Sequence, residues 1–299
     1  MLKSMKKWSP VLLLPTVAAF LVAFLIPFIL GIFLSFQRFR TLDITFMSVG
    51  RDKQFHFLKF NNMTFEGLGN YIRAFNDPAF INSFWFTVKF TVVAIVTINI
   101  FAFFLALLLT KSIKGTNLFR TVFFMPNLIG GIVLGYIWLA IINGVLRYFD
   151  LTILYDPKYG FWGLVILMNW QLIGYMMIIY IAGIQNISPD LIEAAEIDGA
   201  GYFAKIIHII IPSVMPSVTI CLFLTLTNSF RLFDQNLALT GGAPKKGTEM
   251  LALNIVNTMQ ETYATAPGTG QAKAVVFFLV VAVIALAQLF LTRSKEVEV

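Results

Sequence analysis

The sequence predicts an all-α membrane protein with six transmembrane helices, and three observations lead to this fold class. The mean hydropathy of the 299 residues is +0.81. Hydrophobic residues make up 58% of the chain and charged residues only 12%, whereas a soluble globular domain has about 25% charged residues. Six long windows also lack Asp, Glu, Lys and Arg, and a transmembrane helix needs about 20 mostly apolar residues.

Each window holds one predicted helix, and together they form a single domain over residues 1–299. We place the six spans at 11–36, 90–110, 121–146, 161–185, 207–231 and 274–292. The first span follows three lysines, as a secretory signal would. Its apolar run is much longer than the ~7–15 residues of a signal sequence, so we expect a helix that is retained.

The orientation follows from the basic residues beside the spans, because short cytoplasmic segments are rich in Lys and Arg. The N-terminus carries Lys3, Lys6 and Lys7, and the link between the second and third spans carries Lys111, Lys114 and Arg120. Neither segment contains an acid. We therefore expect both termini in the cytoplasm, with 185–205 on the same side and the long segments 37–89 and 232–273 outside.

Several classes of protein are disfavoured by the composition. One cysteine and two histidines allow neither a disulfide nor a His/Cys metal cluster. The net charge of +7 is scattered over loops, without the basic stripe of a nucleic-acid-binding protein. No G-x-x-x-x-G-K-[ST] nucleotide-binding motif occurs. A membrane enzyme or an ion-coupled secondary carrier would want acids at membrane depth, and the six windows contain none.

Segment 188–212, between the fourth and fifth spans, predicts two short helices. Ser188 suits a helix N-cap and Pro189 the first helical position. Gly199 and Gly201 can end this helix with positive φ. A second helix then starts near Tyr202 with an apolar stripe formed by Phe203, Ile206, Ile207 and Ile210. Such a segment is either an interfacial connector or a helix that fits a groove on a partner.

The same segment resembles the EAA coupling motif of ABC importer permeases. The motif spacing E-A-A-x(3)-G-x(9)-I-x-x-P is matched by Glu193, Ala194, Ala195, Gly199, Ile209 and Pro212. Two further stretches resemble carbohydrate-uptake permeases of the maltose and glycerol-3-phosphate type. One is F-E-G-L-G-N-Y at 65–71, and the other is F-D at 233–234 followed by L-T-G-G-A-P at 239–244, where Ala243 departs from the pattern.

The resemblance implies a subunit of an ATP-driven sugar importer in the cytoplasmic (inner) membrane. Such a permease pairs with a second, homologous permease, with two ATP-binding cassette subunits and with an extracellular sugar-binding protein. It contains no catalytic residue and no cofactor or metal of its own, since ATP and Mg bind to the partner subunits. The residues implied to couple it to the ATPase are Glu193, Ala194, Ala195, Asp198 and Gly199.

The resemblance also implies sugar contacts in the fourth and fifth spans, at Gln171, Tyr175, Asn228 and Ser229. Uncharged polar side chains at membrane depth fit a sugar, but they equally fit hydrogen bonds between helices. The substrate site could also lie wholly in the partner permease. An amino acid or a polyol phosphate remains the alternative cargo. Arg231 and Asp234 could form an ion pair, and Asn99, His208 and Cys221 are expected to be structural.

Overall fold

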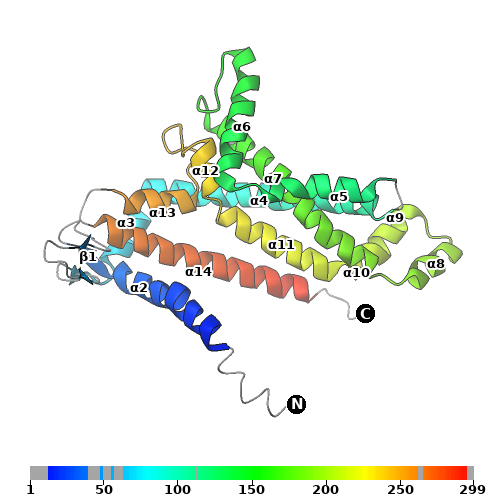
Figure 1. Cartoon of the computed structure of the whole chain (residues 1–299), viewed down its shortest axis with the longest axis horizontal. Helices are drawn as coiled ribbons and strands as arrows, with labels where there is room; N and C mark the ends of the chain where they lie inside the picture. The colour runs from blue at the N-terminus through cyan, green and yellow to red at the C-terminus, as the bar shows by residue number, and fades with distance from the viewer. Residues whose placement is uncertain are drawn as a thin grey trace, which may run out of the picture. The chain divides into compact units, whose positions relative to one another are not determined.

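The structure is a computed structural model that describes residues 13–39, 48–49, 55–56, 63–111, 114–261 and 265–294. The N-terminal lysines and most of the predicted outer segment between 40 and 62 lie outside the described residues. Nearly all described elements are helices, as the fold class predicts (Figure 1). Residue contacts divide the chain into two compact units: Met1–Phe80 with Ile255–Phe278, and Ile81–Asn254 with Leu279–Val299.

In the first unit, a helix over Leu13–Ser35 leads into a small β-corner. This helix contains a π-helical turn, η1 (Leu21–Leu25), followed by α2 (Ile26–Ser35). Strand β1 (Gln37–Phe39) pairs antiparallel with β4 (Met63–Phe65), and β2 (Ser48–Val49) pairs with β3 (Phe55–His56). Helix α3 (Gly69–Asn76) follows β4.

The F-E-G-L-G-N-Y stretch builds this corner. Asn70 is completely buried, and its Nδ2 donates to the carbonyl oxygens of Ser35 at 2.8 Å and Gln37 at 2.9 Å. Arg73 donates to both carboxylate oxygens of Glu66, at 2.8 and 2.6 Å. Asn70 therefore satisfies carbonyls at the end of α2 that the helix itself leaves without partners.

A buried lysine closes the other side of the first unit. Lys273, on α14 (Ala266–Arg293), is 1% exposed. Its Nζ lies 2.6 Å from Asp77 Oδ2 and 2.7 Å from Thr258 Oγ1 of α13 (Leu251–Met259). Asp77 also caps α4 (Pro78–Leu109), accepting from the N–H of Ala79 at 2.9 Å. The lysine thus joins three elements, and its charge is paired as a buried charge must be.

The second unit is built around α7 (Pro157–Gln185), which is the most buried of the candidate spans. Of its 18-residue apolar window, 61% is buried by the rest of the chain. Helix α4 contributes a stripe of residues four apart to this core, formed by Phe90, Ala94, Ile98, Ala102 and Ala106. Helix α5 (Thr116–Phe124) and α11 (Met215–Phe230) pack on α7. Asn99 of α4 accepts from the Tyr180 hydroxyl at 2.8 Å and donates to Thr225 Oγ1 at 3.3 Å, so it is the helix–helix contact expected of it.

Two predicted spans are broken rather than straight. The third consists of α5, the 3-10 turn η2 (Met125–Leu128) and α6 (Gly131–Leu146), and a further 3-10 turn, η3 (Arg147–Phe149), follows it. Pro126 starts this break, and Gly130 completes it with extended backbone, φ −60° and ψ 140°. The 121–146 window is charge-free, but a charge count does not register a proline that removes a helical hydrogen bond.

The fifth predicted span is bent by 71° between Tyr202–Ser213 and Met215–Phe230. Its first half contains α9 (Tyr202–Lys205), a π-helical turn η4 (Ile206–Ile210) and α10 (Ile211–Ser213). Within the described residues, five helices are long and apolar enough to cross a membrane, and six if this bent pair counts as one. The π-turn shifts the stripe predicted for 203–210, because a wider turn changes the angle between successive side chains.

Two helices begin earlier than their charge-free windows. Helix α4 starts at Pro78 rather than near 90, and α14 starts at Ala266 rather than 274. Lys89 is exposed on α4 and Lys273 is buried on α14, so both lysines are accommodated within a helix. A window that ends at the first charge therefore underestimates the length of these helices.

Candidate functional site

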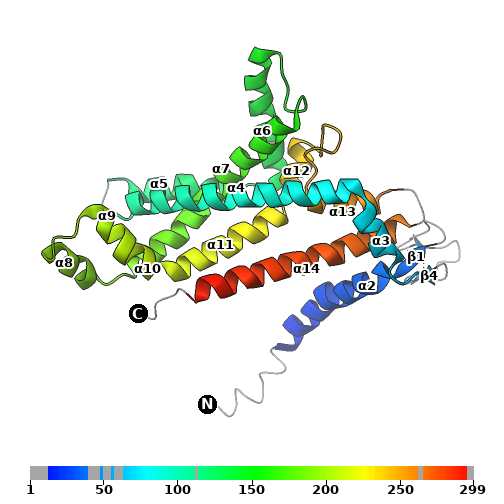
Figure 2. The ribbon, with the colours of Figure 1, turned by 180° about the vertical axis from the view of Figure 1, so that it is seen from behind.

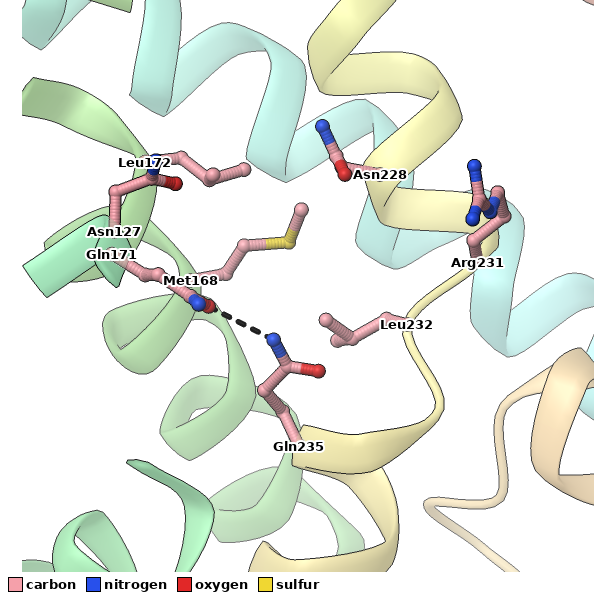
Figure 3. A pocket seen from close by; sticks show the side chains of 8 residues that line it. All are labelled: Asn127, Met168, Gln171, Leu172, Asn228, Arg231, Leu232 and Gln235. Atoms are coloured by element: carbon pink, nitrogen blue, oxygen red, sulfur yellow. Dashed lines mark hydrogen bonds between the residues drawn. The ribbon is translucent and has the colours of Figure 1, made fainter. Parts of the chain in front are cut away.

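A polar pocket lies in the second unit among α7, α11, η2 and α12 (Asp234–Leu239) (Figure 3). Its volume is about 180 Å³. Four amide side chains and one guanidinium give it its polar character, and the lining consists of Asn127, Met168, Gln171, Leu172, Asn228, Arg231, Leu232 and Gln235. Amides present both donors and acceptors, so the pocket can bind a ligand that carries both.

Two of the amides bond to each other across the pocket. Gln235 Nε2 donates to Gln171 Oε1 at 2.9 Å, shown as the dashed line in Figure 3. Gln171 Nε2 in turn lies 3.5 Å from the carbonyl oxygen of Ile129, at the limit of a hydrogen bond. The side chain of Asn228 donates to the carbonyl of Leu224 one turn below, at 2.8 Å. A ligand that replaced the Gln171–Gln235 bond would find one donor and one acceptor already oriented.

The pocket also holds a positive charge. Arg231 lines it at the end of α11, and none of the lining residues is acidic. The ion pair considered between Arg231 and Asp234 does not occur in the described structure. The guanidinium is therefore available to a ligand with hydroxyl or anionic oxygens.

Two of the four sugar contacts implied by the sequence line this pocket, namely Gln171 and Asn228. Tyr175 lies outside the lining, and its ring packs on Phe124 with centroids 6.3 Å apart. Ser229 is fully buried between α7 and α11, where its hydroxyl donates to the carbonyl of Thr225 at 2.7 Å. Both side chains are held by packing rather than turned to the cavity.

Two lining residues were missed by the sequence reasoning, Asn127 and Gln235. Asn127 follows Pro126 inside an otherwise apolar window, and Gln235 follows Asp234 just beyond the fifth predicted span. A lone amide within an apolar window is a usable signal for Asn127, because unpaired polar groups are costly there. No such signal exists for Gln235, since only the placement of α12 brings it to the pocket.

The L-T-G-G-A-P stretch forms the turn after α12. Gly241 and Gly242 have φ of 55° and 84°, which glycine adopts without the strain that other residues incur. Asn236 Nδ2 donates to the carbonyl of Thr248 at 2.8 Å, and its Oδ1 accepts from the N–H of Met250 at 2.9 Å. Thr248 Oγ1 donates to Thr240 Oγ1 at 2.9 Å. This network fixes α12, and with it Gln235.

A second candidate site is the helix α8 (Pro189–Ile197), which contains no buried residue. Glu193, Ala194 and Asp198 are exposed, and Ala195 is partly so. Figures 1 and 2 both show α8 at an outer end of its unit, beside α9. Ile197 of this helix is 87% exposed.

Gly199 ends α8 in a Schellman motif. Its φ is +74°, its N–H donates to the carbonyl of Glu196 at 3.1 Å, and the N–H of Ala200 donates to that of Ala195 at 2.8 Å. These are the bonds that define this C-cap, so the positive φ expected of Gly199 is confirmed. The same expectation is wrong for Gly201, which has φ −68° and precedes α9. Ser188 precedes α8 but makes no side-chain capping bond.

One ion pair ties α8 to α9, and other local contacts hold the residues around it. Lys205 of α9 forms an ion pair with Glu196 at 2.6 Å. Lys111, just after α4, lies 4.7 Å from the ring centre of Tyr202. His208 Nδ1 is 3.1 Å from the carbonyl oxygen of Ala204, and Cys221 is completely buried. Both residues have the structural surroundings expected of them.

Comparison with known proteins gives a family match and several similar transport proteins. Residues 98–296 match the family described as binding-protein-dependent transport system inner membrane component. The probable starch degradation products transport system permease protein AmyD of Thermoanaerobacterium thermosulfurigenes is 42% identical, over 97% of this chain and 96% of that protein. The trehalose/maltose transport system permease protein MalF of Thermococcus litoralis is 28% identical, over 84% of this chain and 83% of that protein.

A solved structure shares the fold. It is that of a bacterial ABC transporter involved in the import of the acidic polysaccharide alginate, with a TM-score of 0.74 and 19% sequence identity over 98% of both chains. A second structure of the alginate transporter, with a pentasaccharide-bound periplasmic protein, has a TM-score of 0.73. The likeness extends over the full length of this chain, including both units.

Proposed function

Because the chain belongs to the family of binding-protein-dependent transport system inner membrane components, we propose that it is the membrane subunit of a sugar importer and that the polar pocket receives the sugar. The observation that supports this most directly is the set of four amides and one guanidinium gathered between α7, α11, η2 and α12. Sugar hydroxyls both donate and accept hydrogen bonds. Relatives named for starch degradation products and for trehalose and maltose support the same cargo class.

The sugar would enter by replacing the bond between the two glutamines. Its hydroxyls would accept from Gln235 Nε2 and donate to Gln171 Oε1, so the two amides exchange one partner for another without losing a hydrogen bond. Met168, Leu172 and Leu232 supply the apolar part of the lining, which suits the C–H faces of a sugar ring. Because the exchange would be close to balanced in energy, the site could also release the sugar, as transport requires.

The small volume supports a shared site. The pocket measures about 180 Å³, whereas sites that enclose a ligand usually measure ~300–1,000 Å³. A second, homologous permease would supply the opposite wall. Delivery by an extracellular sugar-binding protein fits the family description, and the pair would lie in the cytoplasmic membrane with both termini of this chain inside.

ATP and Mg would act in two ATP-binding cassette subunits that contact α8. The helix is exposed and acidic, and it ends in a rigid cap at Gly199. Closure of the ATPase pair would move α8, and the bend between α10 and α11 would transmit the movement to the helix that carries Asn228 and Arg231. Two arrangements of the bundle, selected by ATP, would then open the pocket to opposite sides of the membrane.

Arg231 favours a second candidate cargo, a polyol phosphate. A guanidinium binds phosphate in a bidentate manner, and the pocket offers it no acid. Loss of glycerol-phosphate uptake with normal oligosaccharide uptake in Arg231→Gln would support this cargo instead.

Uptake of a labelled malto-oligosaccharide tests the proposal. We expect Gln171→Leu and Gln235→Leu to raise the transport KM about 5–10-fold each, because each removes a hydrogen bond worth ~1 kcal/mol. Ser229→Ala is the control, since Ser229 is not among the residues that line the pocket, and its KM should be unchanged. An unaltered KM in both glutamine variants, with normal protein levels, would move the sugar site out of this pocket.

A further inference from the structure

A second cavity of the second unit is almost entirely apolar. It is a groove of about 510 Å³ between α4, α5 with η2, and α7. Its walls include Phe101, Phe104, Leu105, Phe123, Trp170 and Ile173. Gly174 lies at its base, where an added Cβ would collide with the backbone of Phe123. The groove is therefore formed by direct backbone contact between α5 and α7, and water is a poor occupant of an apolar cavity.

Basic residues lie at one end of this groove. Leu109 follows Leu105 by four residues on α4, so it lies on the same face one turn further along. Arg120 Nη2 donates to the carbonyl oxygen of Leu109 at 2.7 Å. Lys111 and Lys114 are exposed in the link that follows. Arg120 thus lies just beyond the last apolar wall residue of α4. Lys111, whose Nζ lies 4.7 Å from the ring centre of Tyr202, and Lys114 follow in the adjoining link.

These cations have no acidic neighbour close by in the sequence. The sequence contains no Asp or Glu between 78 and 149. In the part of the chain that the structure describes, no ion pair joins an acid to Lys111, Lys114 or Arg120, and Glu196 of α8 is paired with Lys205. Arg120 itself is half-buried, and its hydrogen bond is to the backbone carbonyl of Leu109. Its charge is therefore not matched by an acid within the described chain.

We propose that this groove is a binding site for an anionic phospholipid, with an acyl chain along the apolar walls and the headgroup phosphate at Arg120, Lys111 and Lys114. Basic clusters beside grooves between transmembrane helices are known to hold anionic headgroups. In the orientation proposed above, the cluster faces the cytoplasmic leaflet. The site is separate from the polar pocket, and it requires only that the chain is a membrane protein.

The charge at one end of the groove favours a lipid over a partner helix. A headgroup phosphate is anionic and would be held by Arg120, Lys111 and Lys114, whereas an apolar partner helix brings no requirement for cations there.

Lipid retention tests the site without reference to transport. The tagged full-length chain, with whatever subunits accompany it, is extracted from its membranes and exchanged into nanodiscs of phosphatidylcholine with or without phosphatidylglycerol. Bound lipid is then measured by native mass spectrometry, and stability by thermal unfolding. We expect phosphatidylglycerol to be retained and to raise Tm above that in phosphatidylcholine alone, with an effect that weakens as salt is raised.

Three variants separate headgroup from acyl chain. Lys111→Gln with Lys114→Gln, and Arg120→Gln, should each reduce retained phosphatidylglycerol several-fold. Ile173→Trp should do the same by filling the groove with no change in charge. Lys245→Gln with Lys246→Gln is the matched control, because it removes two charges from the turn after α12, remote in sequence from the groove.

Three outcomes would overturn the proposal. The first is equal retention of both lipids by the unaltered chain. The second is phosphatidylglycerol retention that Ile173→Trp and the Lys111/Lys114 variant leave unchanged. The third is a cross-link from Ile173→Cys to a second protein chain, which would assign the groove to a partner helix. Loss of sugar uptake has no bearing on these readouts, so the lipid site and the proposed cargo fail independently.

Discussion

Gly199 and Asn70 show how single residues of the motifs determine backbone geometry. Gly199 adopts φ +74° to close the Schellman motif of α8, and Asn70 satisfies two carbonyls at the β-corner. Substitution of Gly199 is therefore expected to displace α8, and substitution of Asn70 to displace the β-corner.

Gly199→Val should uncouple sugar uptake from ATP hydrolysis. A β-branched residue at positive φ costs ~1–2 kcal/mol and would displace the end of α8. We expect uptake to fall at least tenfold while the amount of protein in the membrane is unchanged. Gly199→Asn is the control, since Asn tolerates this conformation, and it should retain most of the activity. Full uptake by the valine variant would exclude a requirement for this cap.

Glu66 predicts a pH dependence of stability. Its hydrogen bonds from Arg73 hold the pKa of the Glu66 carboxyl below its usual value of 4.5. A lowered folded-state pKa contributes stability that is present at neutral pH and is lost as the pH falls through that pKa. We expect Tm measured between pH 6 and pH 3 to decline less steeply in Glu66→Gln than in the unaltered protein, by an amount equivalent to ~1 kcal/mol or less because the pair is partly exposed. Identical slopes would show that this pair contributes nothing.

Among the elements, the break in the third span determines where α12 can sit. Gly131 and Gly135 lie on the face of α6 that packs against α12, where an added Cβ would meet Asp234 Cβ at 2.7 Å and Ala238 Cβ at 2.5 Å. Because α12 carries Gln235, the approach of these two helices positions one side of the polar pocket. The close approach that these glycines allow is thus also what shapes the site.

Gly135→Val tests this packing. Overpacking of this kind costs ~1–3 kcal/mol, so we expect a Tm several degrees lower and a weakened sugar affinity. Gly144→Val on the same helix is the matched control, because no atom lies within 4 Å of an added Cβ there. Equal stability of the two variants would contradict the tight contact between α6 and α12.

The whole molecule is expected to work only in a complex. Its exposed helix α8 and its small, open pocket are both expected to need partners. Three candidate spans are also barely buried by the rest of the chain. The buried share of the 18-residue apolar window is 0% in Leu13–Ser35, 11% in Gly131–Phe149 and 6% in Ala266–Arg293. Each of these helices must therefore meet lipid or another subunit.

Purification of the tagged chain in mild detergent should co-isolate a protein with a nucleotide-binding motif and a second six-span permease. Glu193→Lys should lower the recovery of the ATPase several-fold, because it reverses a charge on the exposed face of α8, without affecting recovery of the second permease. Isolation of the chain alone, or as a homo-oligomer, would argue against the proposed assembly.

The sequence by itself determined the class of the protein, because transmembrane helices must be long and apolar in a local run of residues that composition reveals. It also determined the position of α8 and its cap, since N1 proline and C-cap glycine act through local backbone geometry. Its account of the pocket was partial. Gln171 and Asn228 line it, but Tyr175 and Ser229 do not.

Only the tertiary structure decided the rest. The burial of Lys273 and the arrival of Gln235 at the pocket both depend on contacts between residues far apart in sequence. Helical spacing tells which residues share a face, but which face meets a cavity depends on how α7, α11 and α12 pack. A side chain can be recognised as polar from its identity, whereas its neighbours are set by the packing of the helices around it.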